Sequence, residues 1–253
     1  MFIFSPLDQF DMKLFIGFAS PIDFISNLNI TTFTIYTILV YLVIYYIFKL
    51  SLNNKKIIGS QWFLSIEATF HTILNMVKGQ IGGTAYGTYV PFIYTLFIFI
   101  LIANLIGMIP YSFALSACLV FIISLSIIIW IGVTILGLVK HGFVFFSLFV
   151  PGGTPLPLVP VLVLIELLSY TARAVSLGLR LSANTLAGHL LLNILSSLIF
   201  TFMSISYLTF GIGILPLFGV FAIVGLEWVI GMIQAYVFSI LTSSYIKDAV
   251  YLH

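Results

Sequence analysis

The chain contains a series of apolar runs, each close to the length that a helix needs to cross a lipid bilayer. A membrane-spanning helix requires about 20 predominantly apolar residues, and runs of this kind occupy residues 31–50, 88–109 and 113–139. Hydrophobic residues make up 62% of the 253 residues, and charged residues only 6%. Because too little polar surface is available to cover such a chain in water, lipid is its expected solvent. The sequence therefore predicts an integral membrane protein built from helices.

The C-terminal part of the sequence predicts two helices that are longer than one membrane thickness. The segment Pro151–Pro157 contains the strongest helix-breaking signal, and no proline follows from residue 161 to residue 215. We expect long helices at 156–198 and 204–248. About 40 residues at 1.5 Å each span about 60 Å, twice the hydrocarbon thickness. Such helices must tilt strongly or lie partly along the membrane plane.

Residues 61–79 show a different periodicity, with one apolar and one polar helical face. The apolar face comprises Trp62, Phe63, Ile66, Phe70, Ile73, Leu74 and Val77. The opposite face comprises Glu67, His71, Asn75 and Lys78. This pattern is typical of an amphipathic helix that lies in the membrane interface. The predicted fold class is all-α integral membrane, with about five membrane-embedded helices, one interfacial amphipathic helix and a single membrane domain over residues 1–253.

The basic residues predict the orientation of these helices. The first spanning segment and the amphipathic helix are accompanied by Lys49, Lys55, Lys56 and Lys78. The N-terminal segment instead contains Asp8, Asp11 and Asp23. Because Lys and Arg are retained on the inner side of a membrane, residues 49–85 are expected inside and the N-terminus outside. Five crossings then place the C-terminus inside.

Several classes of function lack the residues that they need. A net charge of +2 without a Lys/Arg cluster argues against nucleic-acid binding. Cys118 is the single cysteine, which excludes an internal disulfide and a cysteine-based metal site. The sequence has neither a phosphate-binding Gly-rich loop nor a His/Glu metal motif. We therefore expect no metal, no cofactor and no nucleotide-hydrolysing site in this chain.

Polar side chains form one continuous line along the predicted 156–198 helix. Its members are Glu166, Ser169, Arg173, Ser176, Arg180 and Asn184. The three charged residues are seven positions apart, and a step of seven rotates a helix by only about 20°, so they share a face. A charge at membrane depth costs about 2.5–3.5 kcal/mol on insertion scales and usually marks an ion or proton pathway.

The predicted 204–248 helix contributes two polar residues of its own. Glu227 and Gln234 are seven positions apart and share a face. His189, on the preceding long helix, points about 140–180° away from the polar line. Structural roles are alternatives for several of these residues. Glu166 and Arg173 could form an ion pair that only joins helices, Glu227 could pair with an arginine of the other long helix, and His189 could be a core histidine.

Arg180 is the residue for which a purely structural role fits least well. A guanidinium stays protonated at any physiological pH, so it cannot relay protons by titrating. It can hold a mobile carboxylate in its ionised form and block a proton from leaking past. A fixed cation flanked by titratable groups is the arrangement that a proton pathway with two separate halves requires.

Two rival functions predict other features. A secondary transporter or self-contained channel would be expected to show inverted repeats or broken helices around a midplane site, and the sequence shows neither. A purely structural membrane subunit would not need five ionisable groups at membrane depth. A pathway for protons or ions remains the better interpretation.

Five sequence blocks resemble one family of membrane proteins. The segment Ser176–His189 reads SLGLRLSANTLAGH and is similar to the signature of the a subunits of F-type ATP synthases. The blocks Ala103–Tyr111 (ANLIGMIPY) and Pro155–Pro160 (PLPLVP) resemble further conserved parts of that family. The ends, Ser5–Phe10 (SPLDQF) and Lys247–His253 (KDAVYLH), resemble its fungal mitochondrial form, often called subunit 6.

The resemblance implies specific roles for the polar residues. Arg180 would face the essential carboxylate on a rotating ring of small subunits, the c-ring, and prevent a proton short circuit. Glu227 and His189 would line a half-channel open to the intermembrane space, and Glu166 would belong to a half-channel open to the matrix. Three further residues match polar positions near these paths, namely Asn184, Gln234 and Arg173.

The resemblance also implies an assembly and a location. The two long helices would form a tilted hairpin that wraps the c-ring. The chain would have no active site of its own and would act as the proton-translocating stator subunit of a proton-transporting two-sector ATPase. Its partners would be the c-ring, the peripheral stalk, other small membrane subunits, lipid and protons, in ATP synthase dimers. The location would be the mitochondrial inner membrane, with the N-terminus toward the intermembrane space and the C-terminus toward the matrix.

Overall fold

The computed structural model describes residues 14–16, 30–51, 61–83, 85–109, 112–149, 158–205 and 207–251. Outside these residues lie the Ser5–Phe10 block, the acidic residues Asp8, Asp11 and Asp23, the pair Lys55 and Lys56, and the breaker segment Pro151–Pro157.

Helices form almost all of the described chain. The element order begins with β1 (Leu14–Ile16) and β2 (Ile30–Thr31), which pair antiparallel, and continues through α2 (Thr32–Ser51), α3 (Gln61–Ile81), α4 (Tyr86–Gly107), η1 (Leu115–Ala117), α5 (Leu119–His141), η2 (Gly142–Phe149), α6 (Val159–Ile205) and α7 (Tyr207–Val250). Five helical segments of the described residues are long and apolar enough to cross a membrane, namely Thr32–Ser51, Tyr86–Gly107, Leu119–Ser147, Val159–Ser204 and Pro216–Val250. The predicted all-α membrane fold is confirmed.

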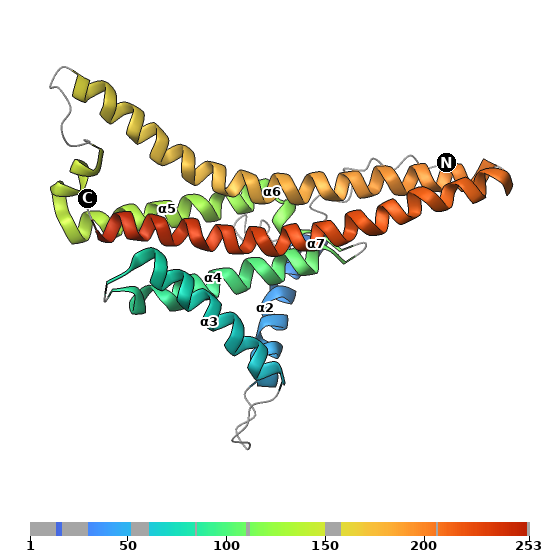
Figure 1. The fold of residues 1–253 in the computed structure, drawn as a ribbon, viewed down its shortest axis with the longest axis horizontal. Helices are drawn as coiled ribbons and strands as arrows, with labels where there is room; N and C mark the ends of the chain where they lie inside the picture. Colours follow the sequence, from blue (N-terminus) through green and yellow to red (C-terminus); the bar gives the residue numbers. More distant parts are fainter. Residues whose placement is uncertain are drawn as a thin grey trace, which may run out of the picture.

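The two longest helices run antiparallel along the whole length of the molecule (Figure 1). Helix α6 has 47 residues and α7 has 44, which correspond to about 70 and 66 Å at 1.5 Å per residue. Helix α5 packs against both of them, and α3 and α4 pack against α7. Helix α2 packs on α4 and lies at a steep angle to the α6–α7 pair (Figure 1). The long hairpin is thus the element on which the other helices assemble.

The main apolar core lies where α3, α4, α5 and α7 meet. Its most buried members include Ile73 of α3, Ile93 and Ile100 of α4, and Phe238 of α7. Buried hydroxyl groups in α7 bond back to carbonyls of their own helix. Thr242, for example, donates to the carbonyl oxygen of Phe238 at 2.8 Å. These hydroxyl groups therefore enter the core without needing partners on other helices.

Helix α5 begins later than the predicted start at residue 113. The backbone is extended at Ala114 and Cys118, on either side of the short η1 helix. The Ser112 hydroxyl donates to the carbonyl oxygens of Ile106 at 2.8 Å and Gly107 at 3.1 Å, which satisfies carbonyls left open at the end of α4. Residues 113–117 are buried. An apolar stretch therefore forms a packed turn here, and apolarity alone could not distinguish that turn from a helix.

Helix α6 extends to Ile205, past the predicted end at residue 198. The added residues contain neither glycine nor proline. The hydroxyl groups of Thr201 and Ser204 donate to the carbonyl oxygens three residues earlier, at 2.7 and 2.9 Å. Because these groups are satisfied inside the helix, they do not end it.

Only the C-terminal half of α3 packs closely against other helices. Ile73, Met76, Val77 and Ile81 are buried, whereas Trp62, Phe63, Leu64 and Phe70 are exposed. The exposed part presents large apolar side chains next to polar ones, as an interfacial helix does.

Candidate functional site

The polar line of α6 faces outward from the protein and forms one wall of a cavity. Its members Ser169, Arg173, Ser176 and Arg180 line a space of about 340 Å³, together with Leu241 and Tyr245 of α7 and two further residues of α6, Ala172 and Leu177. The helical spacing of four and three residues brings these side chains into one row. This space is named the arginine cavity below.

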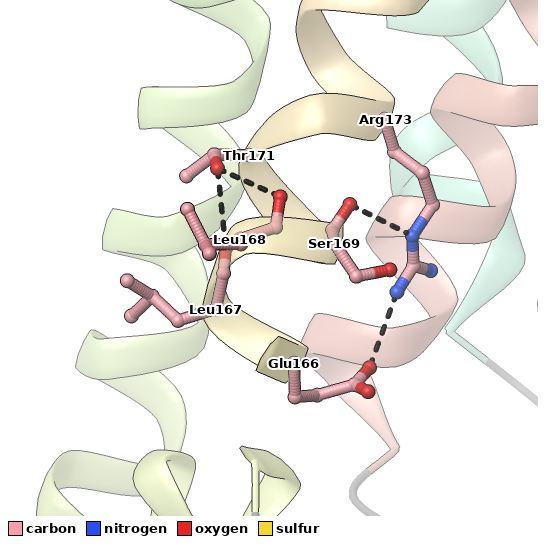
Figure 2. Close-up of polar contacts among 6 residues, drawn as sticks. All are labelled: Glu166, Leu167, Leu168, Ser169, Thr171 and Arg173. Atoms are coloured by element: carbon pink, nitrogen blue, oxygen red, sulfur yellow. Dashed lines mark hydrogen bonds and ion pairs between the residues drawn. The ribbon is translucent and has the colours of Figure 1, made fainter. Parts of the chain in front are cut away.

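Glu166 and Arg173 form an ion pair within α6 (Figure 2). The distance from Arg173 Nη2 to Glu166 Oε1 is 3.3 Å, and Arg173 Nε donates to the carbonyl oxygen of Ser169 at 3.4 Å. The hydroxyl of Thr171 bonds to carbonyls of its own helix on another side of α6. The two charged side chains are 44% and 42% exposed, so this pair is open to its surroundings and does not join α6 to another helix. The alternative of a buried, helix-joining ion pair is therefore wrong.

Arg180 is exposed and lies on the outer face of α6. In the part of the chain that the structure describes, the single ion pair is that of Arg173 with Glu166. No described carboxylate therefore lies within ion-pair distance of the Arg180 guanidinium. A cation in this position, within an apolar segment, is available to an anionic group from outside the chain.

Asn184, Glu227 and Gln234 come together in a second cavity of about 410 Å³ between α6 and α7. We name it the glutamate cavity. Its wall also includes Gly188 of α6 and Gly231 of α7. Arg180 and Asn184 are one helical turn apart, about 6 Å along the axis of α6. The two polar cavities therefore follow one another along the same helix pair, and the boundary between them lies between these two residues.

Glu227 is only 5% exposed. Neither of its carboxylate oxygens has a hydrogen-bond partner among the described residues. The alternative in which Glu227 pairs with an arginine of the first long helix is therefore not observed. A buried carboxyl group without protein partners is costly, and such groups persist where function needs them.

Gly188 makes room for this carboxyl group. A Cβ atom at Gly188 would lie 2.8 Å from Glu227 Cδ, closer than real Cβ atoms come to other atoms. Glu227 therefore packs directly against the backbone of α6. A second close approach occurs at Gly178, where a Cβ would lie 2.8 Å from Ser126 Oγ of α5. Small residues permit such contacts between membrane helices. Ala183 and Ala187 of α6 are also small, but both are exposed.

His189 is 8% exposed and lies on the inner side of α6, away from the polar line. It directly follows Gly188 in the sequence, so its backbone is next to the glutamate cavity, but its side chain is not among the residues that line that cavity. The structure thus brings Asn184, Glu227 and Gln234 together and leaves His189 behind them.

Two further polar residues belong to this region and were not singled out from the sequence. Tyr245 of α7 is buried and lines the arginine cavity. Tyr245 lies on the same helical face as Glu227 and Gln234. This shared face could have identified it from the sequence. Asn104 of α4 is buried and donates a hydrogen bond to the carbonyl oxygen of Gly231. Asn104 could have been identified from the sequence as a single amide side chain within an otherwise apolar helix.

The packing at Gly188 predicts different effects of two glycine-to-alanine substitutions. A Cβ at Gly132 of α5 meets open space, so Gly132→Ala should raise stability by up to about 1 kcal/mol through the better helix propensity of alanine. Gly188→Ala should give a smaller gain in the midpoint of thermal unfolding or none, because the added methyl group must displace the Glu227 carboxyl group from its place against α6. Thermal unfolding of both variants in lipid nanodiscs measures the difference. An equal gain in both variants would contradict the close packing of Glu227 on α6.

Comparisons with known proteins agree on one family. The family model described as ATP synthase A chain matches residues 31–247. The chain is 64% identical over 253 residues to ATP synthase subunit a of Kluyveromyces lactis, with 100% of this chain and 99% of the relative covered. It is 64% identical over 252 residues to ATP synthase subunit a of Saccharomyces cerevisiae, with 100% and 97% covered.

A less similar relative still matches over nearly the whole length of the chain. ATP synthase subunit a of Yarrowia lipolytica is 52% identical over 249 residues, and the match covers 98% of both chains. The residues matched by the family model span the polar line of α6, Glu227 and Gln234. The chain belongs to the ATP synthase A chain family, as a multi-pass membrane protein of the membrane sector of that enzyme.

Proposed function

We propose that this chain is the stator subunit that passes protons between two offset half-channels and the carboxylates of the c-ring, so that proton flow drives ring rotation and ATP synthesis. The observation that carries the proposal is the separation of the polar residues of α6 and α7 into two cavities. Arg180 and Asn184 lie on either side of the boundary. Membership of the ATP synthase A chain family supports a partner of this kind in the membrane sector.

The glutamate cavity corresponds in this proposal to the half-channel open to the intermembrane space. Glu227 supplies a carboxyl group that can take up and release a proton. Asn184 and Gln234 supply amide groups that can hold water in an otherwise apolar wall. His189 would act from behind this cavity as a second titratable group.

The arginine cavity corresponds to the half-channel open to the matrix. Glu166 would be the titratable group of this half, held by its ion pair with Arg173. This pair is nearly half exposed, so its carboxylate is open to the surroundings of α6. Ser169 adds a hydroxyl group between Glu166 and Arg173, and Ser176 adds one between Arg173 and Arg180.

Arg180 separates the two halves. Its guanidinium keeps its charge at every physiological pH, so a proton cannot pass from one half-channel to the other through it. Ala183 and Ala187 are small, exposed neighbours along α6, which would let a ring helix come close to this face. A ring carboxylate that reaches Arg180 is stabilised in its ionised form and releases its proton.

The membrane potential then drives rotation electrostatically. It supplies about 2.3 kcal/mol per charge for every 100 mV. A ring carboxylate that is neutralised from one half-channel can move into lipid, because a neutral acid costs far less there than an ion. After nearly a full turn it reaches the other half-channel and loses its proton. The rotation is used for ATP formation on other subunits.

We also propose that the chain lies in the mitochondrial inner membrane as a single membrane domain, with the N-terminus toward the intermembrane space and the C-terminus toward the matrix. This orientation rests on the basic residues Lys49 and Lys78 near the ends of α2 and α3. The peripheral stalk and other small membrane subunits are the expected neighbours beside the c-ring, and ATP synthase dimers are the expected assembly.

Replacing Arg180 by alanine should abolish ATP-driven proton pumping while the complex still assembles. The exposed side chain makes no ion pair among the described residues, so its loss should not disturb folding, whereas the barrier between the half-channels disappears. Pumping is measured with a pH-sensitive dye in sealed vesicles that contain the intact complex. Leu179→Ala, an exposed neighbour on α6, is the matched control and should pump normally. Normal pumping by Arg180→Ala would overturn the proposed role of this residue.

Replacing Glu227 by glutamine should slow proton pumping by about 100-fold, the usual scale of a lost proton-transfer group. The substitution keeps the shape of the side chain and removes its titrating proton. Glu67→Gln, at an exposed glutamate of α3, makes the same chemical change away from the cavities and should leave pumping unchanged. If both variants pump equally well in vesicles with equal amounts of complex, Glu227 does not carry protons.

A further inference from the structure

Asn104 connects α4 to α7 next to the glutamate cavity. The residue is 1% exposed, and its Nδ2 atom donates a hydrogen bond to the carbonyl oxygen of Gly231 at 3.0 Å. Met108, which directly follows the last residue of α4, lines the cavity together with Gly231. The amide of Asn104 therefore holds the wall of the cavity from behind.

Gly231 is one helical turn after Glu227 on α7, and both residues line the same cavity. A Cβ atom at Gly231 would lie 3.5 Å from Asn104 Cβ, so the two helices approach closely at this point. The Gly231 carbonyl has two lone pairs. It can serve the helix and still accept the hydrogen bond from Asn104.

The carboxyl group of Glu227 is not held by hydrogen bonds of its own within the described residues. Its place therefore depends on the backbone of α7 and on the packing against Gly188. Ser239 and Thr242 of α7 bond to their own helix. Ser243 and Ser244 contact Met76 and Gln80 of α3, but they lie further along α7 and line neither cavity.

We propose that Asn104 is a positioning residue for Glu227: its hydrogen bond to Gly231 fixes α7 against α4 at the level of the glutamate cavity and so sets where the Glu227 carboxyl group meets water. This inference rests on the proposed function of Glu227. Asn104 does not exchange protons itself. Its Oδ1 atom is buried and has no donor among the described residues, so the bond to Gly231 is what orients the amide.

The test compares Asn104→Leu with Ile100→Val in sealed vesicles that contain the intact complex. Leucine has nearly the shape of asparagine and removes both polar atoms. Because the Gly231 carbonyl lies within α7 and can keep its bond inside that helix, the substitution removes one hydrogen bond without changing the shape of the site. Ile100 lies one turn earlier on α4 and is 1% exposed. Its change to valine loosens the packing without removing a hydrogen bond. The readouts are the amount of assembled complex and the pH dependence of ATP-driven pumping.

Asn104→Leu should assemble at the wild-type level, pump about fivefold more slowly, as expected for one lost hydrogen bond, and reach half-maximal pumping at a different pH. Ile100→Val should keep the wild-type pH profile. Should Asn104→Leu fail to assemble, Asn104→Ala removes the same bond without added bulk and should displace the profile in the same way. A wild-type profile in an assembled Asn104 variant, or an equal displacement in Ile100→Val, would overturn the positioning role.

Glu227→Gln in the same preparations distinguishes this failure from that of the proposed function. Normal pumping by Glu227→Gln would remove the proton-carrying role of Glu227, whatever the Asn104 variants do. Loss of pumping in Glu227→Gln together with an unchanged profile in Asn104→Leu would leave the proposed function in place and reject the positioning role alone.

Discussion

The hydrocarbon of the membrane offers no hydrogen-bond partners, so each polar group at that depth must be satisfied inside the protein or kept for a function. The described helices follow this constraint in two ways. Their hydroxyl residues, such as Thr185 and Ser239, bond to carbonyls one turn earlier in the same helix. The charged and amide residues of α6 and α7 instead gather around two cavities. The hydroxyl groups that are bonded within their own helix are thus separated from the charged and amide groups that the proposed function uses.

The antiparallel contact between α6 and α7 makes this arrangement possible. Gly188 lets the Glu227 side chain pack on the α6 backbone, and Gly178 lets α5 approach the other side of α6. Because both faces of α6 are occupied in this way, its third face, with Arg180 and Asn184, remains exposed. In the proposed function that face meets the ring. A membrane helix with a charged exposed face is poorly suited to lipid, which is a physical reason to expect a protein partner there.

Much of the fold was predictable because long apolar runs and helical periodicity are local properties. The spacing of seven between Glu166, Arg173 and Arg180 predicted one polar face, and Arg173 and Arg180 line the same cavity. The predicted start of α5 was wrong, because a buried apolar stretch can form either a helix or a packed connection. Residues 113–117 are buried and, apart from Ser116, apolar, yet they form the short η1 helix and its extended flank and not the first turns of α5. The predicted end of α6 at residue 198 was also wrong. The hydroxyl groups of Thr201 and Ser204 donate to carbonyl oxygens of the same helix, so these polar residues do not end it.

The sequence by itself determined the solvent of this protein, its helical class and the residues that can carry charge at membrane depth, since composition and periodicity are written along the chain. It left open which of these residues meet. The tertiary structure placed Glu227 against Gly188 and put Asn104 behind the cavity through its bond to Gly231. These contacts join residues up to 127 positions apart. They depend on how closely two helices approach, and that distance follows from the packing of many side chains together, which no local pattern encodes.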